Sequence, residues 1–253
     1  MKFHLYGAKK PMKILAVISA RGGSKEVPRK NLLKLGDKPL IAHMLDKAKK
    51  CDLIDMVICS TDSQEIASVA KSYGVDVPFL RPKELAQDRT PLISSTLHAM
   101  KFMDSIGFIS DIVIQLSPTC PFIKVSSIQK SIEHVLSVEC ESAVSLQKIE
   151  HEHPYRARKL MDNDYFENFI QTINVEAKQF HSRQDLPLLY CTSGGIYTRK
   201  RHLLDKYNGE DFAMGNLRKA VVLDEIESVN IDRMIDFQFA EFLISSNKTL
   251  GYI

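Results

Sequence analysis

The segment "KILAVIS" (Lys13–Ser19) is followed directly by the glycine-rich stretch "ARGGSKEVPRKN" (Ala20–Asn31). An uninterrupted apolar run of this length is typical of a strand buried on both faces, as in a parallel sheet. Glycines after the strand allow a sharp backbone turn. The turn also carries four cations, Arg21, Lys25, Arg29 and Lys30. The pattern therefore predicts a parallel α/β sheet with an anion-binding turn at a strand's carboxyl end.

The same alternation continues along the chain. Strand-like runs "DMVICST" (55–61) and "DIVIQL" (111–116) alternate with the helical patterns "PLIAHMLDKAKKC" (39–51), "SQEIASVAKSYG" (63–74) and "VSSIQKSIEHVLSV" (125–138). This order indicates βαβ units, so we expect a mostly parallel sheet with helices on both faces. We expect "GGIYTRK" (194–200) to resume the parallel pattern and "DRMIDFQFAEFLISS" (232–246) to form a final amphipathic helix.

Composition limits the function. The chain has 253 residues, 44% of them hydrophobic, and Lys plus Arg exceed Asp plus Glu by only 34 to 31. A net charge of +3 is too small to indicate a nucleic-acid binder, and no apolar run is long enough to span a membrane. Five cysteines without a Cys-x-x-Cys pair indicate a reducing cytoplasm. The lysines before the first strand faintly resemble a secretory signal, but the apolar run is short for one.

Residues 150–192 break the alternation. The stretches "EHEHPYRARKL", "NDYFENF" and "FHSRQDLPLL" are charged and irregular, and no Gly/Ser linker or repeat marks a boundary. We therefore expect one domain over 1–253 with an insertion at 150–192. His151 and His153 lack further ligands at metal-site spacing, so we interpret them as polar residues in contact with solvent and not as metal ligands. Cys120 and Cys191 lack an identifiable base and are interpreted as packing residues.

The basic turn fits neither the Walker spacing nor Gly-x-Gly-x-x-Gly, which disfavours an ATPase or a dinucleotide-binding protein. A phosphate-bearing ligand is the natural partner, and a merely solvated basic turn is the alternative.

Beyond these physical arguments, "ARGGSKEVPRKN" closely resembles the nucleotide-binding signature of the acylneuraminate cytidylyltransferases, the CMP-sialic acid synthetase family. That family includes the enzymes that activate legionaminic and pseudaminic acids. Further matches follow in the family's order: "STD" (60–62), "RPKELAQDRTP" (81–91), "SPTCPF" (117–122), "HP" (153–154), "SRQDLP" (182–187), "GGIY" (194–197) and "NID" (230–232).

The resemblance implies a single Rossmann-like, GT-A-like nucleotidyltransferase domain that forms a homodimer and requires Mg²⁺. Such an enzyme joins CTP to the anomeric hydroxyl of a nine-carbon keto-acid sugar and releases pyrophosphate. In the family, the region corresponding to 150–192 dimerises and contributes to the sugar site.

The resemblance also implies roles for individual residues. The implied catalytic residues are Arg21, Lys25 and Asp232. The implied nucleotide-binding residues are Ala20, Arg21, Gly22, Gly23, Ser24, Lys25, Lys30, Asn31, Arg81 and Thr90. The implied sugar-binding residues are Ser117, Arg156 and Arg183, and the implied metal ligands are Asp232 and Asn230.

Three positions depart from the family pattern. Ser117 and Ile123 replace a glutamine and an arginine common in sialic acid enzymes, which weakens sialic acid itself as the substrate. Glu26 replaces a glycine and adds a carboxylate near the expected phosphates, and Asn230 removes one carboxylate from the expected metal site. Another sugar or base, or a nucleotide-binding protein without catalysis, remains an alternative.

Overall fold

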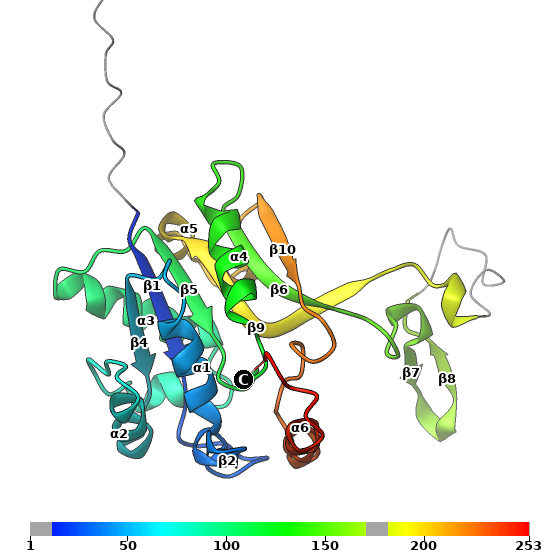
Figure 1. Cartoon of the computed structure of the whole chain (residues 1–253). Coiled ribbons are helices and arrows are strands. Elements are labelled where there is room, and N and C mark those ends of the chain that lie inside the picture. Colours follow the sequence, from blue (N-terminus) through cyan, green and yellow to red (C-terminus); the bar gives the residue numbers. More distant parts are fainter. Residues whose placement is uncertain (1–11, 171–181, 253) are drawn as a thin grey trace, which may run out of the picture.

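The computed structural model describes residues 12–170 and 182–252, and a mixed β-sheet organises them (Figure 1). Its strands lie in the order β10-β6-β9-β5-β1-β4. Their bounds are β1 Ile14–Ser19, β4 Met56–Ser60, β5 Ile112–Leu116, β6 Ser142–Lys148, β9 Tyr190–Lys200 and β10 Arg218–Val222. Two short strands, β2 (Lys34–Leu35) and β3 (Lys38–Pro39), form a separate hairpin. The mostly parallel sheet predicted from the sequence is confirmed.

Strand β1 lies inside the sheet and is buried on both faces. It pairs in parallel with β4 on one side and β5 on the other. Its alternate side chains enter two different cores: Ala16 and Ile18 join one, and Leu15 and Val17 join the other. This two-sided burial explains why the segment is apolar without interruption.

Helices cover both faces, as predicted. The first core is closed by α1 (Leu40–Lys49), α2 (Gln64–Ser72) and α4 (Val125–Leu136), and the second by α3 (Leu92–Ser105) and α5 (Arg201–Asp205). Helix α3 was not assigned from the sequence. The 3-10 turns of this region are η1 (Lys30–Leu32), η2 (Lys83–Ala86) and η7 (Asp211–Ala213).

The prediction for residues 194–200 is wrong in direction. Strand β9 runs antiparallel to both of its neighbours, β5 and β6. The chain leaves the sheet at the end of β6 and re-enters at the same end, where Lys148 pairs with Tyr190. Because no crossover connection returns it to the opposite edge, β9 must run back alongside β6.

Between β6 and β9 the chain extends away from the sheet (Figure 1). This arm carries a hairpin of β7 (Arg158–Leu160) and β8 (Phe166–Asn168), with the 3-10 turns η3 (Pro154–Arg156), η4 (Asp162–Asp164) and η6 (Arg183–Asp185). The arm lies within the stretch 150–192 that the sequence marked as irregular. Its large apolar side chains are exposed: Leu160, Tyr165, Phe166 and Phe169.

The last helix, α6 (Met234–Ser245), is present, but the prediction that it is amphipathic is wrong. Phe237 and Leu243 are buried, whereas Ile235, Phe239 and Phe242 are exposed. Apolar side chains therefore occupy both its inner and outer sides. Within the described parts of the chain, no helix has the length and apolar character needed to span a bilayer.

Candidate functional site

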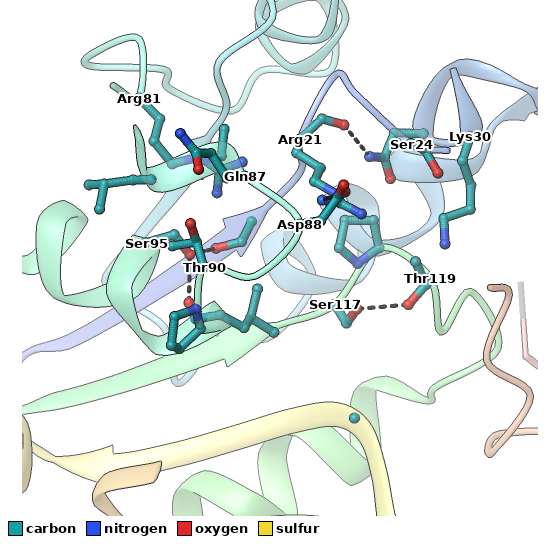
Figure 2. Close-up of a pocket in the computed structure, with 18 of the residues that line it drawn as sticks. Arg21, Ser24, Lys30, Arg81, Gln87, Asp88, Thr90, Ser95, Ser117 and Thr119 are labelled. Carbon is teal, nitrogen blue, oxygen red and sulfur yellow. Dashed lines mark hydrogen bonds and ion pairs between the residues drawn. The ribbon is translucent and has the colours of Figure 1, made fainter. Parts of the chain in front are cut away.

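A cavity of about 360 Å³ lies at the carboxyl edge of the parallel strands (Figure 2). Strands β1, β4 and β5 end at this edge, at Ser19, Ser60 and Leu116. The turns after β1 and β5 supply part of the lining, and the segment 81–95, which runs from η2 into α3, supplies the largest share. This is the edge at which open α/β sheets bind ligands. The lining residues are Ser19, Arg21, Ser24, Lys30, Asn31, Arg81, Leu85, Ala86, Gln87, Asp88, Thr90, Pro91, Leu92, Ser95, Ser117, Pro118, Thr119, Gly194, Asn230 and Asp232.

Close packing fixes the glycine turn after β1. A Cβ atom at Gly22 would lie 2.9 Å from Ser63 Cβ, so the turn approaches α2 more closely than another residue allows. The Gly22 N–H donates to Asp62 Oδ1 at 2.9 Å. Asn31 Nδ2 donates to the Arg21 carbonyl at 3.1 Å and closes the turn from its other end. Asn31 Oδ1 is buried and lacks a partner within the described residues, which leaves one acceptor available to a ligand.

Two cations of the turn bind one carboxylate. Arg21 Nη1 lies 2.6 Å from Asp88 Oδ1, and Lys25 Nζ lies 2.6 Å from Asp88 Oδ2. Hydrogen bonds from Lys25 and Arg21 hold the pKa of Asp88 below its ordinary value. Figure 2 shows Asp88 next to Arg21. The structure therefore brings the predicted phosphate ligands together, with an internal anion between them.

Arg81 lies at the other end of the cavity and is buried. Its Nη2 atom lies 3.7 Å from Asp62 Oδ1, and its Nε atom has no hydrogen-bond partner among the described residues. Burial lowers the pKa of Arg81, and Asp62 opposes that shift. Nearby, Ser19 and Ser95 share a hydrogen bond of 2.8 Å between hydroxyls. A buried N–H without a partner, beside hydroxyl groups, suits recognition of a polar ring edge.

Asp232 lies on the far side of the cavity with two donors on it. Lys30 Nζ is 3.1 Å from its Oδ1 and also donates to the Ile231 carbonyl at 2.6 Å. Asn230 Nδ2 donates to its Oδ2 at 2.9 Å. Thus the amide nitrogen of Asn230, and not its oxygen, faces the carboxylate.

These residues fit Mg²⁺ only together with a phosphate ligand. The described residues contain no cluster of three or more His, Cys, Asp or Glu side chains that could hold a metal ion. Mg²⁺ is commonly held by one or two carboxylates, substrate phosphates and water. Asp232, with a side chain 66% exposed at the cavity, supplies one such carboxylate.

The loop after β5 forms the floor of the cavity. Ser117 and Thr119 share a hydrogen bond of 2.8 Å, drawn in Figure 2. Ile123, which stands where relatives carry an arginine, is fully buried in the core and does not line the cavity. Cys120 is also buried, which raises the pKa of its thiol to about 12 and agrees with a packing role. Cys191, by contrast, is exposed, so its interpretation as a packing residue is wrong.

Six predicted site residues lie elsewhere. Ala20 is in the core, while Gly22 packs on α2. Gly23 and Lys25 line a second, more open hollow that shares Asp88 with the cavity. Arg156 is exposed on the arm, outside the cavity. Arg183 begins η6 on the arm, and its side chain lies outside the described residues.

Several lining residues were not predicted. Asp88, Thr119 and Gly194 lie inside the motifs at 81–91, 117–122 and 194–197. The motifs therefore indicated the right segments of the chain, although these three residues were not themselves predicted to line the site. Ser95 lies on α3, where no motif pointed to it. Glu26, a departure from the family pattern, is exposed and lines no part of the cavity.

Comparison with known proteins identifies the family. A family model described as "Cytidylyltransferase" matches residues 15–238. This range contains all six strands of the main sheet except Ile14, the first residue of β1. The chain belongs to the cytidylyltransferase family. It is a CTP-dependent nucleotidyltransferase, and the predicted family resemblance is confirmed.

Named relatives match this cytidylyltransferase over nearly their whole length. The pseudaminic acid cytidylyltransferase of Campylobacter jejuni (strain 81-176) is 32% identical over 240 residues, covering 93% of this chain and 98% of the relative. The CMP-N,N'-diacetyllegionaminic acid synthase of Legionella pneumophila is 33% identical, with coverages of 94% and 98%. The N-acylneuraminate cytidylyltransferase of Escherichia coli O18:K1:H7 is an exception in length: it is 30% identical over 90% of this chain and 51% of the relative.

Solved structures agree on the fold. A CMP:2-keto-3-deoxy-manno-octonic acid synthetase, solved in complex with CTP, superposes with a TM-score of 0.68. The match covers 93% of this chain and 99% of that chain at 17% identity. A likeness at this identity supports the nucleotidyltransferase fold alone.

Proposed function

We propose that this cytidylyltransferase transfers CMP from CTP to the anomeric hydroxyl of a nine-carbon keto-acid sugar of the sialic acid type. Pyrophosphate is the leaving group. The observation that carries the proposal is the cavity that joins Arg21, Lys30 and Arg81 at the carboxyl edge of the sheet. The relatives named for pseudaminic, legionaminic and acylneuraminic acids indicate the sugar class.

The two ends of the cavity suit the two ends of CTP. Arg21 and Lys25 converge on one anionic group, as ligands of a triphosphate must. Arg81 presents a buried Nε–H for the polar edge of cytosine. In this scheme the sugar hydroxyl attacks the α-phosphorus, the bond to the β-phosphate oxygen breaks, and Arg21 and Lys25 stabilise the charge on the departing pyrophosphate.

Mg²⁺ is the proposed cofactor, and Asp232 is the carboxylate that would hold it. When bound, the ion would neutralise charge on the phosphate oxygens. Asn230 would reach the ion only after its amide turns over, because its nitrogen now faces Asp232. Lys30, bound to the same carboxylate, keeps Asp232 directed toward the cavity when no metal is present.

The arm is the proposed dimerisation and sugar-binding insertion, and Arg156 and Arg183 are the proposed ligands of the keto-acid carboxylate. Arginine grips a planar carboxylate with two parallel hydrogen bonds. Leu160 and Phe166 face each other across β7 and β8 and are 72% and 67% exposed. Exposed apolar pairs of this kind are expected to be covered by another chain. Following the resemblance to the family, we propose that a second copy covers them and that each arm reaches the other copy's cavity.

The decisive assay incubates the enzyme with CTP, Mg²⁺ and a panel of keto-acid sugars. The panel includes pseudaminic, legionaminic and sialic acids, together with an eight-carbon analogue. We expect pyrophosphate release and a CMP-sugar of matching mass with a nine-carbon acid only. Turnover confined to the eight-carbon acid or to another nucleotide would replace the substrate assignment. CTP binding without any turnover would favour a non-catalytic protein.

A second experiment tests the shared site. Mixing Lys25→Ala and Arg183→Ala protomers should restore part of the activity, because each mixed dimer contains one site with both residues intact. Phe166→Glu should convert the dimer to a monomer in sedimentation, whereas Glu167→Gln on the same strand should leave it dimeric. Verified mixed dimers without activity would show that each site is built from one chain.

A further inference from the structure

Asp88 occupies the two cations that the proposed reaction assigns to phosphate. Each of its carboxylate oxygens takes one cation at 2.6 Å, Arg21 on Oδ1 and Lys25 on Oδ2. Neither cation has another carboxylate partner within the described residues. The Lys25 side chain is 81% exposed, so within the described part of the chain little besides Asp88 fixes its position.

A carboxylate that bridges two cations imitates one edge of a phosphate. Both groups present two anionic oxygens to separate N–H donors in short, charge-assisted hydrogen bonds. The oxygens of a pyrophosphate group need the same donors. Asp88 and a bound pyrophosphate group would meet at the same two cations, where their negative charges repel each other, so the two anions compete for Arg21 and Lys25.

Asp88 is free to leave. It is exposed between η2 and α3, and among the described residues its side chain has no hydrogen bond besides those to the two cations. The backbone on both sides of Asp88 is held in place. Thr90 N–H donates to the Gln87 carbonyl at 3.1 Å, Thr90 Oγ1 donates to the Glu84 carbonyl at 3.0 Å, and Arg81 N–H donates to the Thr61 carbonyl at 2.7 Å. Rotation of the exposed Asp88 side chain can thus release both cations while the backbone and Arg81 stay in place.

We propose that Asp88 is an internal competitor for pyrophosphate that promotes product release. It leaves Arg21 and Lys25 when the triphosphate binds, and it returns to them as pyrophosphate departs. The inference rests on the proposed transfer, which makes pyrophosphate the leaving group. CTP overcomes the competition because its base and ribose bind elsewhere in the cavity, whereas pyrophosphate has only its phosphates. Because both ligands must displace Asp88, it weakens the binding of each by the same factor, and pyrophosphate, which has no other contacts, is the ligand that is released.

The test compares Asp88→Asn with wild type in calorimetric titrations of Mg²⁺-pyrophosphate, without CTP or sugar. The amide keeps the shape of the side chain and removes its charge. We expect Asp88→Asn to bind pyrophosphate and CTP each about tenfold more tightly, because neither ligand then has to displace the carboxylate. Asp88→Ala should give a similar increase in affinity, which would exclude a local effect of the introduced amide.

Two controls separate competition from general electrostatics. Glu65→Gln also removes one exposed carboxylate, paired with Arg29 of the same turn but not with Arg21 or Lys25; it should change pyrophosphate affinity less than about twofold. The chain contains no tryptophan, so a Trp introduced at exposed Arg89 reports on the loop. Its fluorescence should change with pyrophosphate in the wild-type background.

The proposal is overturned if Asp88→Asn and Asp88→Ala bind pyrophosphate no more tightly than wild type. It is also overturned if Glu65→Gln gives an equal gain, or if CTP affinity does not rise together with pyrophosphate affinity. These titrations involve no transfer to a sugar. Failure of the sugar panel would therefore refute the proposed function while leaving the pyrophosphate result to be judged separately.

Discussion

Replacing Asn230 by aspartate should strengthen metal binding, and the structure gives the geometry. Asn230 Nδ2 lies 2.9 Å from Asp232 Oδ2. Adjacent ligands of an octahedral Mg²⁺ ion, each at 2.0–2.1 Å from the metal, lie about 2.9 Å apart. In the Asn230→Asp variant, a carboxylate oxygen in the position of the amide nitrogen would therefore share one edge of the octahedron with Asp232.

The size of the effect follows from charge. Two unit charges 4 Å apart interact by about 4 kcal/mol at an effective dielectric constant of 20. The Asp232 side chain is 66% exposed and Lys30 lies 3.1 Å from it, so screening reduces the repulsion between the carboxylates to about 1–2 kcal/mol. A divalent cation relieves that repulsion and is itself attracted to the added charge. We expect the metal concentration for half-saturation to fall about tenfold, or about 1.4 kcal/mol.

The assay follows the free Mn²⁺ signal by electron paramagnetic resonance during titration of the enzyme–CTP complex, so it does not depend on turnover. Asn208→Asp is the matched control, because it adds the same charge at an exposed position whose amide bonds to Glu210. The Mg²⁺ dependence of the rate should shift in parallel for Asn230→Asp alone. An unchanged Mn²⁺ affinity, or an equal gain with Asn208→Asp, would refute the placement of the metal at Asp232.

Further outcomes are expected from the same structure. Lys25→Ala should lower kcat about a hundredfold, or about 3 kcal/mol, because a donor to the leaving group is lost, whereas Arg29→Ala in the same turn should stay near wild type in steady-state kinetics. Gly195→Ala should destabilise the fold by about 1–3 kcal/mol in urea titrations, because the new Cβ would lie 2.3 Å from Ile123 Cδ1; adding Ile123→Val, which removes that atom, should recover much of the loss. Burial lowers the pKa of Lys47 to about 7, so the Lys47 side chain binds its proton more tightly in the unfolded chain than in the folded one. The free energy of unfolding should therefore rise from pH 7 toward pH 9, and Lys47→Met should remove this increase. A parallel pH dependence in both proteins would assign the change to other groups.

Local sequence patterns were sufficient for the core of the fold. The uninterrupted run Ile14–Ser19 is apolar because both faces of β1 are buried, and this requirement is visible in the sequence itself. The turn after it could be assigned because glycine and positive charge act over a few neighbouring residues. The positions of Arg21, Lys30 and Asn31 at the cavity followed from that turn and from the motif order.

The direction of β9 could not be read from "GGIYTRK". An antiparallel strand with both faces covered has the same apolar character as a parallel one, and only the path of the arm fixes its direction. Lys47 shows the same limit on α1. Its charge suggests the solvent side of the helix, yet it is buried and donates to the Pro121 carbonyl.

The alternating α/β pattern, the glycine-rich basic turn after β1 and the family could all be predicted from the sequence. The tertiary structure decided which charges meet: Asp88 with Arg21 and Lys25, and Lys30 with Asp232 across 202 positions of the chain. Secondary-structure propensity and the spacing of apolar residues describe neighbours within one turn, helix or strand, and both can be read from residue types alone. An ion pair between distant residues depends on where the whole backbone carries each charge, so it exists only once the sheet and its loops are assembled.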